Sequence, residues 1–326
     1  MTSQHSALPS EPAAADFATG SIGARLKRLA LATRPAFFPA SVAPVIIGSA
    51  WGYRVAGRFD WLLFTLALIA TLCVHLACNV LNDVGDDLTG ADRINDERIF
   101  PYTGGSRFIQ NGVMSVREMA ALGITLLVIA ALMGLALIDL RGPAVLFFGV
   151  AGVLIGVLYS VPRVQLAAHG VGEAAIAIAF GVLPVTGAAW LQSDRLDWAS
   201  VLISVPVGMW VTAILLINEV PDRNADARAG KRTLVVRLGA KGARRLYLAL
   251  QVTACAAFLL AGIMRLVPWW MGVASLVLLA GAGGAARNIR EPIDRALLTR
   301  SIEMTLRLQT GGCVLLLAAV LLAALL

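Results

Sequence analysis

Long apolar runs separated by short polar segments dominate this chain. Nine runs are long enough, or nearly so, to cross a bilayer core of about 30 Å as helices of about 20 residues. Apolar residues are continuous within each run and do not alternate with polar ones, which disfavours a membrane β-barrel. The runs are Pro35–Tyr53, Trp61–Asn82, Met119–Ile138, Pro143–Tyr159, Gly172–Gln192, Trp198–Asn218, Leu246–Met264, Leu266–Ala286 and Leu308–Leu326. The pattern predicts an all-α, polytopic membrane helical bundle of about nine transmembrane helices.

The N-terminal segment has a different character. Residues 1–24 are rich in Ala, Ser, Pro and Glu without periodicity, so we expect a disordered cytosolic tail. The segment lacks the basic-then-apolar order of a signal peptide. Residues 25–326 are then expected to form a single transmembrane domain.

Composition and charge support a membrane location and orient the chain. Only 14% of residues are charged and 58% are hydrophobic, whereas a soluble domain carries about 25% charged residues. With the N-terminus inside, 22 of the 27 Lys and Arg residues fall in inner segments and loops. The net charge of +7 is therefore a topology signal and not a sign of nucleic-acid binding. The four cysteines and three histidines are scattered and form no metal site, and Gly149, Gly152 and Gly156 predict close helix packing.

Amide and carboxylate side chains gather where the second apolar run ends. Asn79, Asn82, Asp83 and Asp86 are spaced i, i+3, i+4 and i+7, which places all four on one face if the helix continues. Asp87 and Asp92 follow, and then a loop of sequence Gly104-Gly105-Ser106-Arg107. The stretch as a whole runs from Asn79 to Gly112 and would form a cytoplasmic cap loop.

A second polar stretch, Asn218 to Gly239, follows the sixth apolar run. Asn218, Asp222 and Asp226 are spaced i, i+4 and i+8 on one helical face, and both stretches contain Asn-x-x-x-Asp. Four predicted spans separate the stretches, so both fall on the same side of the membrane. Such oxygen ligands suit Mg²⁺. The candidate metal ligands are Asn82, Asp83, Asp86, Asn218, Asp222 and Asp226.

Two interpretations of these polar residues compete. A single Asp at a span end is usually an ordinary solvated loop charge, but two matched sets favour a site. Carboxylate clusters that face each other bind divalent cations, which in turn bind a polyphosphate. Lys231, Arg107 and Arg228 add positive charge beside them, and glycines such as Gly104 and Gly230 let backbone N–H groups approach phosphate oxygens. Gly-Gly-Ser-Arg alone is more often a turn.

With these motifs the chain resembles the UbiA superfamily of membrane prenyltransferases, from about Leu31 to the C-terminus. Asn82-Asp83-x-x-Asp86, with Gly90 and Asp92, looks like the first family motif. The second motif is the most specific match, with Asn218-x-x-x-Asp222-x-x-x-Asp226 before Gly230-Lys231-Arg232-Thr233-Leu234. Three short elements also look like family features: Arg34-Pro35, Tyr159-Ser160 and Gly172-Glu173.

The resemblance implies Mg²⁺-dependent transfer of a prenyl group from a prenyl diphosphate to an aromatic acceptor at the lipid bilayer. Asp86, Asp222, Asp226 and Lys231 would be catalytic, and Arg34, Asp92, Arg107, Tyr159 and Arg228 would bind substrate. Arg107 could pair with an acceptor carboxylate or with the diphosphate. Tyr159 could face the allylic cation, or it could be a buried structural residue.

Within the superfamily, the chain is most similar to the menaquinone branch, which acts on dihydroxynaphthoate. Asn82 to Asp92 fits that branch, whereas Phe100-Pro101-Tyr102-Thr103-Gly104 does not match the element typical of the 4-hydroxybenzoate branch. The branch implies a bacterial inner membrane with the active site on the cytoplasmic side. A 4-hydroxybenzoate or other acceptor is the alternative within the superfamily.

A membrane transporter is the alternative from another class, since Pro-broken spans with Asp residues suit it. The Asp clusters lie at span ends, however, and not in the middle of the bilayer. A CDP-alcohol phosphotransferase also uses two Asp motifs, but its Asp-Gly-x-x-Ala-Arg opening is absent.

Overall fold

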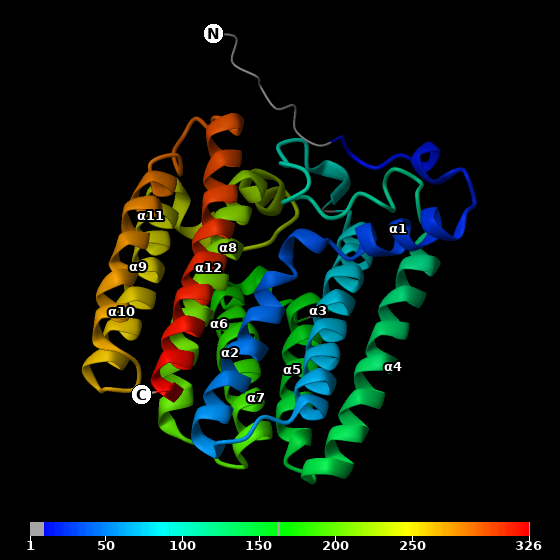
Figure 1. The fold of residues 1–326 in the computed structure, drawn as a ribbon. Helices are drawn as coiled ribbons and strands as arrows, with labels where there is room; N and C mark the ends of the chain where they lie inside the picture. The colour runs from blue at the N-terminus through cyan, green and yellow to red at the C-terminus, as the bar shows by residue number, and fades with distance from the viewer. Residues whose placement is uncertain (1–9, 91, 162–163, 326) are drawn as a thin grey trace.

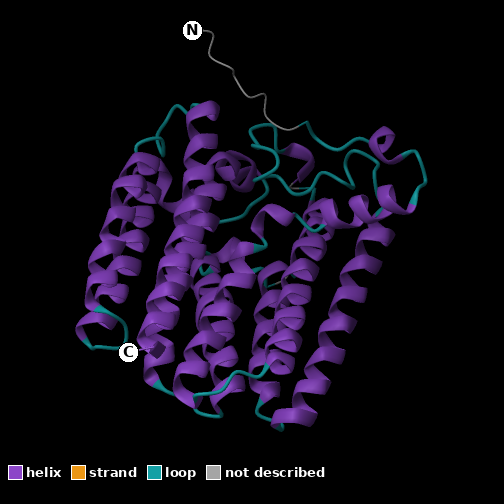
Figure 2. Ribbon diagram, in the orientation of Figure 1, coloured by secondary structure: helices purple, strands orange, loops and turns teal. Residues whose placement is uncertain are grey.

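The protein is described by a computed structural model that covers residues 10–325 except positions 91 and 162–163. Its regular structure over these residues is helical and includes no strand, which confirms the all-α prediction (Figure 2). The α-helices are α1 (Ile22–Ala32), α2 (Pro39–Ala56), α3 (Trp61–Thr89), α4 (Val116–Arg141), α5 (Val145–Ser160), α6 (Gly172–Ala177), α7 (Leu183–Ser193), α8 (Trp198–Arg228), α9 (Leu234–Ile263), α10 (Trp269–Ala274), α11 (Leu278–Ala286) and α12 (Arg295–Leu325). Short helices of other types are η1 (Ala14–Phe17), η2 (Pro35–Phe37), η3 (Asp92–Ile94), η4 (Leu166–His169), η5 (Ile178–Val182, a π-helix) and η6 (Ser275–Val277).

Each of the nine predicted spans corresponds to a helical segment. In the described part of the chain, eight segments are long and apolar enough to cross a membrane. The ninth, Val145–Tyr159 in α5, is shorter. Two spans are built from pieces, because η5 joins α6 to α7 and η6 joins α10 to α11. The polytopic bundle is thus confirmed, and nine is an approximate count of its spans.

Polar residues set where the long helices begin. The Asp60 carboxylate accepts hydrogen bonds from the backbone N–H groups of Leu62 and Leu63 in the first turn of α3, and Asp197 accepts one from Ser200 in the first turn of α8. Ser115 and Glu118 form a capping box at the start of α4. These side chains satisfy backbone donors that would otherwise have no partner at a helix start.

The main core of the bundle lies among α2, α7, α8, α9 and α12, around Trp51, Trp210 and Phe258. Helices approach closely there because of glycines that the sequence analysis did not select. A Cβ at Gly48 would collide with the backbone of α7, and one at Gly208 would lie 2.7 Å from the Ala177 carbonyl oxygen. Glycine at these positions is therefore required by packing.

The prediction of close packing at the α5 glycines is correct for only one of them. A Cβ at Gly156 would collide with the Cys78 sulfur, but Gly149 and Gly152 would meet nothing within 4 Å. Gly149 and Gly152 line a cavity, as Gly156 also does. Their small size leaves room beside α5, and a side chain there would fill part of that space.

The two polar stretches lie at the same end of the bundle (Figure 1). The C-terminal ends of α3 and α8 meet there, together with α1 and the loop between α3 and α4. The short connections after α2, α4, α7 and α9 lie at the opposite end, as does the C-terminus. The predicted alternation of spans therefore brings both polar stretches to one side.

The N-terminal segment reaches the same end. Residues 10–24 include η1 and the start of α1, and the Glu11 carboxylate accepts hydrogen bonds from Arg98 and Asn111. Residues 1–9 lie outside the described part of the chain. Disorder in residues 1–24 stays a prediction. That prediction did not anticipate the contacts that Glu11 makes with Arg98 and Asn111.

Candidate active site

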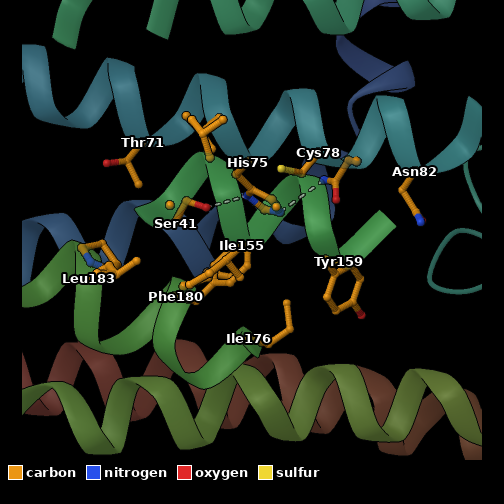
Figure 3. A pocket seen from close by; sticks show the side chains of 18 of the residues that line it. Ser41, Thr71, His75, Cys78, Asn82, Ile155, Tyr159, Ile176, Phe180 and Leu183 are labelled. Atoms are coloured by element: carbon orange, nitrogen blue, oxygen red, sulfur yellow. Dashed lines mark hydrogen bonds between the residues drawn. The ribbon is translucent and has the colours of Figure 1, made fainter. Parts of the chain in front are cut away.

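A cavity of about 1030 Å³ opens between α2, α3, α4, α5, α7 and α8. Its lining is mostly apolar, and its polar groups concentrate toward the end where α3 and α8 terminate. Figure 3 shows Asn82 and Tyr159 toward one end of this space and Leu183 toward the other. Leu135 and Val150 line the cavity while being 61% and 58% exposed, so the cavity reaches the lipid-facing surface between α4 and α5.

The first polar stretch supplies three cavity residues from α3, namely Asn79, Asn82 and Asp86. Asp83 is not among the residues that line the cavity. It is 3% exposed, and its carboxylate accepts a 2.9 Å hydrogen bond from the backbone N–H of Ser106. The four residues thus do not share one environment, because Asp83 is turned toward the loop at Ser106 and the other three toward the cavity.

The three candidate metal ligands of the second polar stretch all face the cavity. Asn218, Asp222 and Asp226 all line it, as their spacing on α8 predicts. The Asn218 side-chain oxygen is buried and has no hydrogen-bond partner in the described structure. A buried oxygen without a partner costs free energy unless a ligand interacts with it. This end of the cavity is therefore suited to a cation.

Lys231 connects the two stretches. Its ammonium nitrogen lies 3.0 Å from Asp86 Oδ1 on α3 and 3.5 Å from Asp226 Oδ1 on α8. Gly230, with φ of 79°, ends α8 and turns the chain so that Lys231 points back into the cavity. Residues that are 145 positions apart in the sequence thereby form one site.

The loop after α3 closes over this site and fixes Asp222. Asn95 donates a 2.8 Å hydrogen bond to one Asp222 oxygen, and the backbone N–H of Gly104 donates a 3.3 Å bond to the other. Gly104 has φ of 73°, a conformation that glycine adopts without strain. The glycine-rich loop therefore lies against the carboxylates, as the sequence suggests. Its backbone N–H groups at Gly104 and Ser106 donate to the carboxylates of Asp222 and Asp83.

The candidate substrate-binding residues fall into two groups. Arg34 and Tyr159 line the cavity, and Arg34 also donates a 2.8 Å hydrogen bond to the Tyr102 carbonyl oxygen. Arg107 and Arg228 do not line it. Arg107 is buried with its Nε 3.8 Å from a Glu11 oxygen, and exposed Arg228 donates to the Ile94 carbonyl oxygen. Asp92 begins η3, and its side chain lies outside the described part.

As the side chains stand, Lys231 occupies the position between Asp86 and Asp226. Across the described residues, no group of three His, Cys, Asp or Glu side chains is arranged to hold a metal ion. The lysine supplies the counter-charge that these carboxylates need in a partly buried place. A divalent cation and Lys231 would compete for the same two oxygens.

Several polar residues of the cavity lie outside the residues that the sequence singles out. Asn95 contacts Asp222 from a loop whose path no helical period could give. Ser41 and His75 line the cavity from α2 and α3. His75 precedes Asn79 by four positions, so extending the polar face of α3 by one turn would have found it.

An oxygen-rich, charged end above an apolar cavity that reaches the lipid-facing surface is an arrangement typical of a membrane enzyme. The chain belongs to the UbiA prenyltransferase family, whose family model matches residues 41–306. It is a prenyltransferase, and the resemblance drawn from its two motifs is confirmed.

Individual relatives agree with this assignment. A 1,4-dihydroxy-2-naphthoate octaprenyltransferase of Escherichia coli (strain K12) is 32% identical over 279 residues, which cover 83% of this chain and 88% of that protein. The apo structure of a UbiA homologue from Aeropyrum pernix K1 matches with a TM-score of 0.65 and 17% identity, covering 89% of this chain and 98% of the other. A UbiA homologue from Archaeoglobus fulgidus, bound to GPP and Mg²⁺, matches with a TM-score of 0.62 and 16% identity, covering 89% and 99%. Both structural likenesses concern the fold.

Proposed function

We propose that this enzyme transfers a prenyl group from a prenyl diphosphate to a hydroxy-naphthoate, requires Mg²⁺ and serves menaquinone biosynthesis. One observation carries the proposal: the two Asn-x-x-x-Asp sets converge on Lys231 at the polar end of an apolar cavity. The Escherichia coli relative, named for 1,4-dihydroxy-2-naphthoate, supports the acceptor class. The Archaeoglobus fulgidus structure, which contains GPP and Mg²⁺, supports the donor and the metal.

The donor set fits a hard divalent ion. Asn82, Asp86, Asn218, Asp222 and Asp226 offer only oxygen ligands from the side chains that Mg²⁺ prefers, and the Asn218 oxygen lacks a protein partner. Bound Mg²⁺ would neutralise the diphosphate and act as a Lewis acid. The Asp83 carboxylate, by contrast, has the separate task of holding the loop at Ser106.

Protein side chains then stabilise the charges of the reaction. Lys231 and Arg34 line the cavity and would stabilise the negative charge that develops on the departing diphosphate. The bond between C1 of the prenyl group and the diphosphate oxygen breaks, and its electron pair leaves with the diphosphate. A pair of ring electrons of the acceptor forms the new carbon–carbon bond, and the ring regains aromaticity by losing the substituent of the attacked carbon, as a proton or, from a carboxylated carbon, as CO₂. The Tyr159 ring faces the cavity, where it would stabilise the allylic cation. The apolar lining accepts the prenyl chain and keeps water away from that cation.

The proposal includes the location of the enzyme. Residues 25–326 would form one domain in a bacterial inner membrane, with the N-terminus and active site in the cytoplasm. The excess of Lys and Arg in the segments at the active-site end supports this orientation.

A panel of acceptors tests the function. Purified enzyme in lipid nanodiscs is given one radiolabelled prenyl diphosphate with a hydroxy-naphthoate or 4-hydroxybenzoate, with and without Mg²⁺. We expect label transfer to the naphthoate, and its loss when Mg²⁺ is chelated. Transfer to 4-hydroxybenzoate and to no naphthoate would overturn the acceptor assignment, and transfer without divalent ions would overturn the metal requirement.

A further inference from the structure

A small polar group interrupts the apolar wall of the cavity. Ser41 on α2 and His75 on α3 both line the cavity while being only 1% and 8% exposed. The Ser41 hydroxyl oxygen lies 2.5 Å from His75 Nδ1, as Figure 3 shows. Most of the lining beyond them is apolar, and the Phe180 ring lies edge-on to the His75 ring at 4.9 Å between centroids. Polar side chains in such a place are expensive unless they have partners.

The hydrogen bonds of Asn79 determine the proton position on His75. Asn79 Nδ2 lies 3.2 Å from the Thr33 carbonyl oxygen, so this atom must be the amide nitrogen and not the oxygen. The same nitrogen lies 3.2 Å from His75 Nε2 and donates to it. His75 Nε2 is therefore an acceptor, and the neutral ring carries its hydrogen on Nδ1.

This tautomer makes the Ser41 hydroxyl a donor toward the cavity. His75 Nδ1–H donates to the Ser41 oxygen, so the hydroxyl hydrogen must find a different acceptor. The described residues offer it no other hydrogen-bond partner. A buried donor without an acceptor is costly, and a ligand oxygen in the cavity would remove that cost.

We propose that the Ser41 hydroxyl, oriented by His75 and Asn79, binds a hydroxyl or carboxylate oxygen of the aromatic acceptor. The proposal rests on the proposed function, because that function supplies an acceptor with oxygens on its ring. Ser41 is a binding residue in this scheme, and His75 and Asn79 are positioning residues.

Distance and chemistry favour the acceptor over the other reactant. His75 precedes Asn82 by seven positions on α3, which separates their Cα atoms by about 10 Å along the helix axis. The diphosphate is therefore expected to lie beyond the reach of Ser41, since it binds at the Asn and Asp side chains. A prenyl chain carries no hydrogen-bond acceptor. The aromatic acceptor is the reactant that combines oxygens with flat apolar faces, which suit Phe180 and Ile155 nearby (Figure 3).

The test measures acceptor binding separately from turnover. Equilibrium dialysis of a radiolabelled hydroxy-naphthoate against enzyme in nanodiscs, without prenyl diphosphate, gives its Kd. Steady-state kinetics give KM for each substrate. We expect Ser41→Ala to raise Kd and KM for the naphthoate about tenfold, the loss of one good hydrogen bond, with KM for the prenyl diphosphate unchanged.

Two further variants test the relay through His75. His75→Gln keeps an acceptor for Asn79 and a donor for Ser41, so naphthoate binding should stay close to wild type. His75→Leu removes both and should weaken binding as Ser41→Ala does. Ser49→Ala is the matched control, because Ser49 is an equally buried serine on α2 that lies outside the cavity lining, and its hydroxyl has no partner in the described structure.

The outcomes separate this inference from the proposed function. Unchanged naphthoate Kd in Ser41→Ala, or an equal rise in KM for both substrates, would overturn the inference. Failure of the wild type to bind a hydroxy-naphthoate would overturn it as well. Binding by the wild type without prenyl transfer would contradict the proposed function, and the comparison of Kd values would still decide the role of Ser41.

Discussion

At the residue scale, Lys231 links the two halves of the candidate site. Its ammonium group lies between a carboxylate of α3 and a carboxylate of α8, at 3.0 and 3.5 Å. Without a positive charge there, Asp86 and Asp226 would repel each other across the end of the cavity. In the proposed function the same ammonium would bind a diphosphate oxygen, and the two carboxylates would help to hold the divalent ion.

We predict opposite effects of Lys231→Ala on metal binding and on turnover. Mg²⁺ affinity in the absence of prenyl diphosphate should rise several-fold, because the ion no longer competes with the lysine for Asp86 and Asp226. Turnover should fall about a hundredfold or more, because a charge that stabilises the leaving group is lost. Calorimetric titration with Mg²⁺ and initial rates measure the two effects.

Lys241→Ala is the matched control, since Lys241 is exposed on α9. It should change neither quantity. Weaker Mg²⁺ binding in Lys231→Ala would contradict competition between lysine and ion.

At the element scale, the loop between α3 and α4 is attached on both of its sides. Its inner side contacts Asp222 through Asn95 and Gly104. Its outer side contacts the N-terminal segment, where the Glu11 carboxylate meets Arg98 and Arg107. The N-terminal segment thus braces the loop that covers the site.

The Glu11 contacts make this brace sensitive to pH. Partial burial alone would raise the pKa of Glu11, but hydrogen bonds from Arg98 and Asn111 and the charges of Arg98 and Arg107 outweigh it and lower the pKa. Because the pKa is lowered, ionised Glu11 stabilises the attachment fully at pH values above the ordinary pKa range of a carboxyl group. That stabilisation is lost as pH falls through the lowered pKa.

We predict that residues 10–17 are protected from hydrogen exchange at neutral pH and lose protection under acidic conditions, once rates are corrected for the intrinsic pH dependence of amide exchange. Glu11→Gln should show lower protection at neutral pH, with little further loss of protection on acidification, because no carboxylate remains to be protonated. Mass spectrometry of enzyme in nanodiscs measures both. Equal pH dependence in wild type and variant would exclude Glu11 as the cause.

At the scale of the whole molecule, periodicity and charge predict most of the fold but only part of the site. Apolar runs of membrane length can form little other than helices in lipid, so the spans and their alternation followed from the sequence. The i+4 spacing along α8 correctly placed Asp222 and Asp226 on the cavity. Such spacing could not assign Asp83, whose role depends on Ser106 in an irregular loop. Nor could it identify Gly48, whose role depends on how close α7 approaches.

The orientation of the whole bundle gives a separate prediction. In a variant without its native cysteines, a cysteine at exposed Ala229 should react only with reagent applied from the cytoplasm, and one at exposed Arg195 only from outside. Arg195 lies in the connection between α7 and α8, Ala229 directly follows the other end of α8, and the two ends of α8 lie at opposite ends of the bundle (Figure 1). Labelling of both from the same side would contradict the span count, and reversed labelling would contradict the orientation.

The central claim is that two stretches far apart in the sequence form one magnesium-dependent site. A double-mutant cycle tests it most directly, with Mg²⁺-dependent prenyl transfer to a hydroxy-naphthoate measured for Asp86→Asn, Asp226→Asn and the double variant. If both carboxylates hold one bound ion with one diphosphate, either single substitution removes most of the rate enhancement that the pair provides. The double variant should then be about as slow as the slower single variant. Losses that multiply in the double variant would mean that Asp86 and Asp226 act independently, and would contradict the account.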